Sequence, residues 1–127
     1  QVQTGLMLQP GERVMKLVRL RTRGNLPILH STAWLPVDIA AGFQPEDFSR
    51  HPLSELMARA GFPYFTIEAA AGAALADPVL ARDLQVPIGS ALVDVRRVAF
   101  DQHGRAIEYQ HILGPSDRYQ MRVTMRG

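Results

Sequence analysis

The chain has 127 residues, of which 46% are hydrophobic and 20% charged, so its size and composition are those of one globular domain with a single core. It contains no cysteine, which excludes a disulfide scaffold, thiol catalysis and cysteine-ligated metal, and fits a reducing cytoplasm. The chain contains no apolar run of 18 residues, so the sequence predicts no membrane span. Its net charge is +2 and its acidic residues are interspersed among the basic ones, so it lacks the basic excess of a dedicated nucleic-acid surface.

The first residues of the chain carry no targeting signal. Residues 1–5 lack a charged stretch followed by an apolar run, so they do not form a signal peptide. The chain also lacks an initiator methionine. We therefore expect residues 1–127 to be one domain cut from a longer protein.

The N-terminal part predicts a β-hairpin. Residues 13–23 mix aliphatic, β-branched and basic side chains in rough alternation, which is typical of a strand. Residues 24–27, Gly-Asn-Leu-Pro, have turn chemistry. Residues 28–35 form the second expected strand, which Pro36 ends.

Two helices are predicted in the middle of the chain. The first has an apolar stripe at i, i+3, i+4 and i+7, formed by Leu53, Leu56, Met57 and Ala60. Residues 64–76 carry signals for helix and for strand, and we interpret them as a strand. Asp77 and Pro78 are a good N-cap and first-turn residue, and they open the second helix.

The C-terminal part predicts three more strands, at residues 91–100, 106–113 and 118–126, with a hairpin turn at 101–104. The last of them alternates cleanly between apolar and polar side chains. The order of elements predicts an α+β domain with an antiparallel sheet of about six strands and flanking helices.

Arg19 and Arg21 lie two residues apart on the first predicted strand, so their side chains share a face. Two converging guanidinium groups form a receptor for carboxylate or phosphate. The alternative is that both are solvated arginines on an exposed strand.

His30, Thr32 and Trp34 share one face of the second predicted strand. Imidazole, hydroxyl and indole groups together suit a small polar ligand. The alternative places Trp34, the only tryptophan, in the core with His30 as a satisfied neighbour.

Glu108 lies between Ile107 and Tyr109 in a strand that we expect to be central. Burying an unpaired carboxylate there is unfavourable, so Glu108 needs a partner. That partner is either a ligand group or an arginine such as Arg118.

Two segments resemble a known family. The stretch Glu108-Tyr109-Gln110-His111, followed by Asp117-Arg118-Tyr119, and the upstream strand at 28–36 are similar to the effector-binding (UTRA) domain of GntR-type transcription factors, HutC subfamily. The resemblance implies a chorismate-lyase-like fold that binds a small-molecule effector and forms a homodimer. It also implies a preceding winged helix-turn-helix domain that binds operator DNA and is not in this chain.

The resemblance adds to the candidate ligand-binding site. Family members that sense phosphorylated sugars use two arginines spaced like Arg19 and Arg21, and the glutamate corresponding to Glu108 often contacts the effector. The full predicted set is Arg19, Arg21, His30, Thr32, Trp34, Glu108 and Arg118.

The chain also departs from the family pattern. His30 stands where the family commonly has glutamate, which suggests an acidic effector. Residues 114–116, Gly-Pro-Ser, replace the usual Tyr-Arg-Gly, and residues 52–54, Pro-Leu-Ser, replace Ser-Leu-Tyr. These changes argue against a sugar phosphate and leave the effector open.

Metal binding and catalysis find little support. The four histidines have no metal-ligand spacing, and no nucleophile, phosphate-binding loop or compelling acid–base pair occurs, so we expect no cofactor and no enzyme. Two alternatives stay open: a lyase that shares the fold, with Arg19 or Arg21 holding an acid and Glu108 as general acid, and a dimerisation module with a vestigial pocket.

Overall fold

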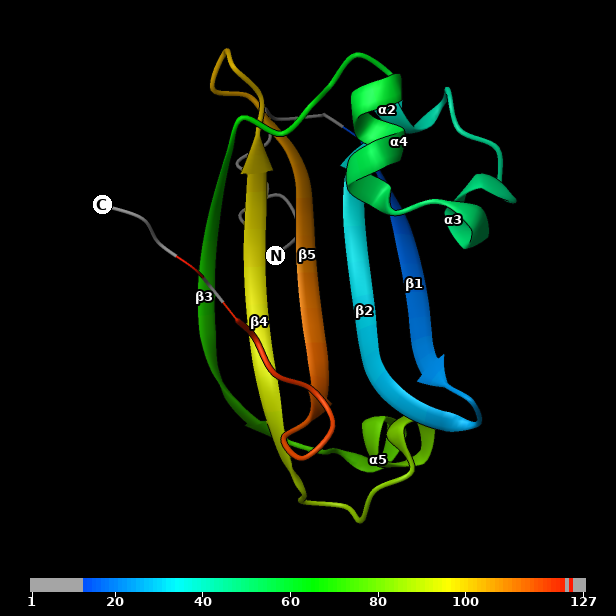
Figure 1. The fold of residues 1–127 in the computed structure, drawn as a ribbon, viewed down its shortest axis with the longest axis vertical. Helices are drawn as coiled ribbons and strands as arrows, with labels where there is room; N and C mark the ends of the chain where they lie inside the picture. The colour runs from blue at the N-terminus through cyan, green and yellow to red at the C-terminus, as the bar shows by residue number, and fades with distance from the viewer. Residues whose placement is uncertain (1–12, 123, 125–127) are drawn as a thin grey trace. The chain divides into compact units, whose positions relative to one another are not determined.

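The computed structural model describes residues 13–122 and 124. Its five strands form one sheet in the order β1-β2-β5-β4-β3 (Figure 1). The strands are β1 (Val14–Arg23), β2 (Leu26–Pro36), β3 (Thr66–Leu75), β4 (Ala91–Phe100) and β5 (Ala106–Pro115). The helices are α2 (Val37–Ala40), α3 (Asp47–Arg50), α4 (Leu53–Arg59) and α5 (Pro78–Leu84). The predicted α+β class with an antiparallel sheet is confirmed.

The described residues divide into two compact units. Unit 1 contains residues 13–17, 33–69 and 97–110, and unit 2 contains residues 18–32, 70–96, 111–122 and 124. Each strand contributes residues to both units. Each unit also has its own hydrophobic cluster.

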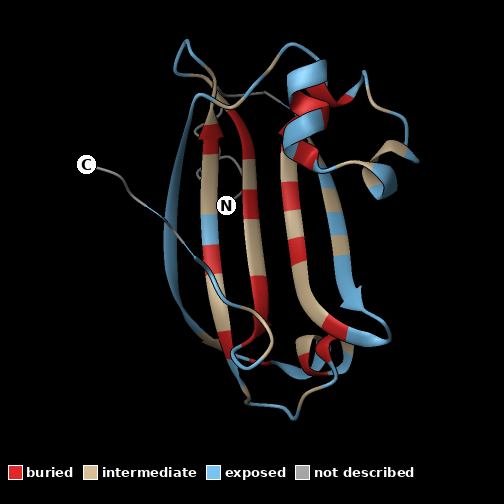
Figure 2. Ribbon diagram, viewed as in Figure 1, coloured by how far each residue is buried: buried red, intermediate tan, exposed pale blue. Residues whose placement is uncertain are grey.

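The core of unit 1 lies between strands and the helices that follow β2. Ala33 and Leu35 of β2 are fully buried against Met57 of α4 and Ile39 of α2. The apolar stripe predicted from Leu53, Leu56, Met57 and Ala60 is confirmed for the first three, which are the buried residues of α4, whereas Ala60 is exposed and follows the helix. Figure 2 shows the buried positions of α4 and β2 in red.

The core of unit 2 forms around α5. Leu84 of this helix is fully buried with Leu92 of β4 and Leu113 of β5. The predicted cap is confirmed, since the side chain of Asp77 accepts a hydrogen bond of 2.8 Å from the backbone N–H of Leu80. The helix ends at Leu84, and the next residue, Gln85, has a left-handed φ of 55°.

Two features differ from the prediction. The last predicted strand is wrong for residues 118–122 and 124, which form a turn and irregular backbone, while 123, 125 and 126 lie outside the described residues. The chain turns there because the N–H groups of Arg118 and Tyr119 both bond to the carbonyl of Pro115. The short helices α2 and α3 were not predicted, since a four-residue helix shows no amphipathic period.

The choice of strand over helix at residues 64–76 is correct for β3. Its alanines favour a helix in isolation, but pairing with β4 decides the conformation. No helix among residues 13–122 and 124 has the length and apolarity that crossing a membrane requires.

Candidate functional site

Glu108 is the most buried ionisable side chain at the predicted site, with 1% of its surface exposed. In unit 1 its carboxylate accepts hydrogen bonds from the hydroxyl of Tyr64 and the amide of Gln110. Arg97 Nη2 lies 3.7 Å from Glu108 Oε2. The partner that a buried carboxylate requires is thus present in the protein, as two donors and a cation.

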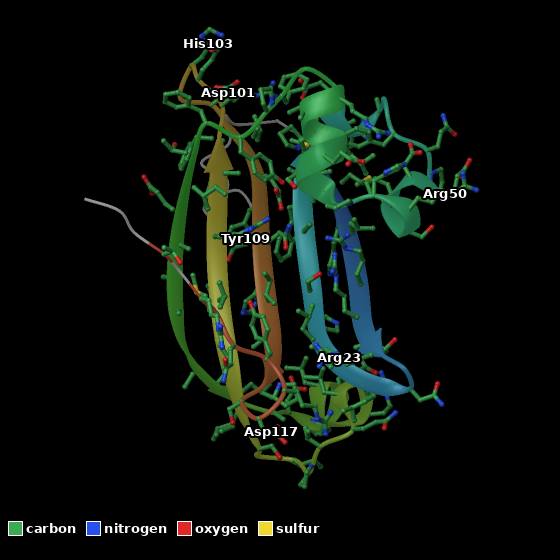
Figure 3. The ribbon with its side chains drawn as sticks, viewed as in Figure 1. Arg23, Arg50, Asp101, His103, Tyr109 and Asp117 are labelled. Carbon is green, nitrogen blue, oxygen red and sulfur yellow. The ribbon has the colours of Figure 1, made fainter. Side chains whose placement is uncertain are left out.

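Aromatic rings complete this part of unit 1. The guanidinium of Arg97 lies 6.0 Å from the centre of the Tyr64 ring, within the range of a cation–π contact. Trp34 stacks on Tyr109 with ring centres 5.0 Å apart (Tyr109 is labelled in Figure 3). Trp34 therefore has a structural role in the sheet, and a ligand contact by its indole stays a prediction.

Arg118, which the sequence offered as a partner of Glu108, bonds backbone carbonyls of unit 2. In unit 2 its Nη1 donates to the carbonyls of Pro27 at 3.0 Å and Leu84 at 2.8 Å. Its Nη2 donates to the carbonyl of Gln85 at 3.3 Å. These bonds tie the turn after β5 to the start of β2 and the end of α5, so the geometry favours a structural role for Arg118.

The two arginines of β1 differ in exposure. Arg19 is half-buried and alternates with exposed Val18 and Leu20, whereas Arg21 is exposed. Because they are two residues apart on one strand, both belong to the same face. One half-buried and one exposed guanidinium are compatible with either an anion site or a solvated pair.

His30 and Thr32 are both half-buried on β2 in unit 2. The Nδ1 atom of His30 is covered and has no hydrogen-bond partner among the described residues. Buried polar nitrogen atoms normally have a partner, so this ring nitrogen is suited to meeting a polar ligand.

A partly buried polar cluster in unit 2 was not singled out from the sequence. His111 Nε2 lies 2.9 Å from Asp94 Oδ1, and Arg96 Nε lies 3.5 Å from the same oxygen. Arg97 and Tyr64 were likewise missed as neighbours of Glu108. The sequence contains no signal for these contacts, because they depend on the register of β4 against β5 and on the path of the loop before β3.

Two of the cavities in the described part of unit 1 are lined by none of the predicted site residues. One of about 290 Å³ is lined by residues of the loop before β3, including Tyr64 and Phe65, and of the β4–β5 turn, including Asp101 and His103. Asp101 and His103 are labelled in Figure 3. The other, of about 190 Å³, lies beside α4. Among the residues that the structure describes, no cluster of three His, Asp or Glu side chains could hold a metal ion.

The comparisons with known proteins settle the family. The model described as "UTRA domain" matches residues 1–120. The chain belongs to the UTRA domain family. No curated protein matches it.

Solved structures resemble this UTRA domain over nearly its whole length. The ligand-binding domain of a putative GntR-family regulator from Bordetella bronchiseptica is 25% identical, with a TM-score of 0.86 over 98% of this chain and 80% of that chain. A GntR-family regulator from Enterococcus faecalis V583 is 20% identical, with a TM-score of 0.87 over 97% and 88%. The effector domain of PhnF from Mycobacterium smegmatis is 22% identical, with a TM-score of 0.84 over 99% and 78%.

These matches are to regulator domains and not to enzymes. The UTRA assignment made from the sequence is therefore confirmed, and the lyase alternative receives no support. The HutC subfamily remains a prediction.

Gly114 stands where the UTRA family commonly has a tyrosine. The surroundings of Gly114 explain why this domain has a glycine there. A Cβ atom on Gly114 would lie 2.7 Å from Cβ of Tyr119 and 2.9 Å from the carbonyl oxygen of Ile28. Both contacts are shorter than real Cβ contacts allow. Tyr119 and the backbone of β2 thus occupy the space that a side chain at 114 would need.

Proposed function

We propose that this UTRA domain senses a small anionic effector for a bacterial transcriptional regulator. The observation that carries the proposal is the UTRA match over residues 1–120, together with regulator domains as structural neighbours. Binding would alter the placement of operator-binding domains outside this chain and so change DNA affinity, by coupling between two sites. Such a regulator acts in the cytoplasm.

The proposal that the effector is an anion rests on the charges of three arginines. Arg19 and Arg21 supply two guanidinium groups on one strand of unit 2, and Arg21 is exposed to solvent. Arg97 neutralises Glu108 inside unit 1, so this carboxylate does not have to be matched by a cationic ligand. We therefore propose a carboxylate or phosphate that Arg19 and Arg21 bind, with His30 and Thr32 as further polar contacts.

A thermal-shift screen of the purified domain tests the proposal. A panel of small carboxylates and phosphates is compared with neutral analogues of the same size. A ligand at 100 times its Kd stabilises the folded state by about 2.7 kcal/mol, so a true effector raises the Tm clearly. If no anion raises the Tm of a well-folded domain, the sensing proposal fails and the dimerisation module with a vestigial pocket replaces it.

We further propose a homodimer. Dimeric operators require a two-fold arrangement of the protein that binds them. A sheet with two edges in a chain of this size offers the strands for such contact. Analytical ultracentrifugation at tens of micromolar tests the assembly, and a domain that sediments only as a monomer contradicts it.

A further inference from the structure

Strand β3 is exposed along its whole length. Among the strands that the structure describes, it is one of the two outer ones and is hydrogen-bonded to β4 on one side only. Every residue of β3 is exposed except Ala74, which is half-buried. Figure 2 shows this strand in the colour of exposed residues almost throughout. An outer strand with an open edge is a template for pairing with another chain.

The two outer strands differ in chemistry. Strand β1 carries Lys16, Arg19, Arg21 and Arg23. Charged side chains of one sign repel a second copy and protect an edge against pairing. Strand β3 contains no lysine, arginine or proline, and Glu68 is its one charged residue. The usual protection of an outer strand is thus present on β1 and missing on β3.

The large apolar side chains of β3 and of the residue before it are exposed and lie at the two ends of the strand. Phe65, which directly precedes the strand, is 69% exposed, Ile67 is 47% exposed and Leu75 is 72% exposed. Between Glu68 and Leu75 the strand contains only alanine and glycine. Small residues in the centre with large apolar residues at both ends make the strand complementary to an antiparallel copy of itself.

We propose that β3 pairs antiparallel with β3 of a second copy, with the two-fold axis at Ala70. This inference rests on the proposed homodimer and names its interface. In this register Phe65 lies opposite Leu75 of the partner subunit, and Glu68 lies opposite Gly72 of the partner subunit. An axis at Glu68 would instead place two carboxylates directly opposite each other, which is destabilising. Pairing about Ala70 joins the two sheets into one.

Cysteine cross-linking tests the register, because the chain contains no cysteine of its own. Directly opposite residues of an antiparallel pair have Cα atoms about 4.5–5.5 Å apart, a separation that a disulfide spans. The variant Ala70→Cys is therefore expected to form a covalent dimer under mild oxidation. The matched control is Val18→Cys, an exposed position on β1, which stays monomeric under denaturing electrophoresis.

A second pair of variants tests the interface without oxidation. Ala70→Asp places two carboxylates opposite each other at the axis and is expected to raise the Kd of dimerisation at least tenfold. Val79→Asp, at an exposed position on α5, leaves that Kd unchanged. Both positions are exposed, so neither change disturbs a core.

The outcomes separate this inference from the homodimer proposal. A native domain that sediments only as a monomer overturns both. A native dimer in which Ala70→Cys does not cross-link and Ala70→Asp has no effect keeps the homodimer and overturns the β3 interface. Cross-linking of Val18→Cys in place of Ala70→Cys assigns the interface to β1.

Discussion

The guanidinium of Arg118 donates a 2.8 Å hydrogen bond to the carbonyl oxygen of Leu84, the last residue of α5. The last carbonyls of a helix lack partners within the helix and carry partial negative charge. A cation that donates hydrogen bonds to these carbonyls supplies the missing partners and offsets the partial negative charge. Because Arg118 also bonds Pro27 and Gln85, its side chain joins the turn after β5 to two other backbone segments of unit 2, the start of β2 and the end of α5.

We expect Arg118→Ala to destabilise the domain by about 1.5–3 kcal/mol, the range for hydrogen bonds to a charged group, since carbonyls are left unpaired. Arg118→Lys should recover little, because an ammonium group cannot reproduce the planar fork. Urea denaturation measures the free energy of unfolding. The control is Arg122→Ala at an exposed position, and equal stability of the two alanine variants contradicts the structural role.

Tyr64→Phe and Glu108→Gln test the buried carboxylate of unit 1. Each should lower the free energy of unfolding by about 1–3 kcal/mol, because each leaves a polar partner unsatisfied. The double variant should lose less than the sum of the single variants, with a coupling of about 0.5–3 kcal/mol for groups in one network. The measurement is a double-mutant cycle by urea denaturation. Strict additivity would mean that the tyrosine and the glutamate act independently.

Ligand binding by β1 is tested by the double variant Arg19→Ala with Arg21→Ala. Each charge-assisted hydrogen bond is worth about 1.5–3 kcal/mol, so the affinity for an anionic effector should fall at least tenfold. Isothermal titration with the compound found in the thermal-shift screen measures the loss. Arg23→Ala on the same strand is the control, and unchanged affinity in the double variant assigns Arg19 and Arg21 to the solvated face.

Gly114→Ala should destabilise the domain by about 1–3 kcal/mol, the usual effect of overpacking, because the new methyl group meets Tyr119 and the backbone at Ile28. The control is Gly42→Ala, where the nearest atom to an added Cβ is 3.8 Å away. Thermal unfolding compares the two variants. Equal melting temperatures would show that Tyr119 can move aside.

The ion pair between Asp38 and Arg105 predicts a pH dependence. The hydrogen bond from Arg105, 2.8 Å long, holds the pKa of Asp38 below its ordinary value of 3.8. The stabilisation is therefore complete above the unfolded pKa and is lost as the pH falls through the lower folded pKa. Asp38 is 58% exposed, so solvent screening limits the effect to about 1 kcal/mol at most.

Asp38→Asn checks this pair. The difference in free energy of unfolding between the variant and the native domain should be present at pH 7 and vanish in strong acid. It should also shrink in 1 M salt, which screens exposed charges. A difference that is constant from pH 7 to strong acid would exclude the ion pair as its source.

The sequence predicted most of the fold because its signals are local. Turn residues delimit the β1–β2 hairpin, an apolar stripe marks α4, and Asp77 with Pro78 begins α5. The prediction of a last strand at 118–126 failed because an alternating pattern reports only the polarity of successive side chains. It does not show that a neighbouring strand is available for pairing. The described part of this segment turns at Pro115 instead.

The site was less predictable than the fold. The sequence indicated that Glu108 needs a partner, but it could not identify Tyr64 and Arg97, which lie in a loop and another strand. Arg118 was a reasonable candidate by charge alone. Its bonds to backbone carbonyls could not be foreseen, since every residue provides a carbonyl and only the folded chain selects three.

The position of β5 between β2 and β4 also governs how the domain can fold. We expect the β1–β2 hairpin to form early during synthesis, but the inner edge of β2 can pair with β5 only after residues 37–105 have been made. Contacts between such distant segments are slow to form, because a long loop must close first. Until β5 emerges from the ribosome, β2 presents an unpaired edge. A nascent chain stopped before residue 106 should therefore be the form most prone to aggregation and to capture by chaperones.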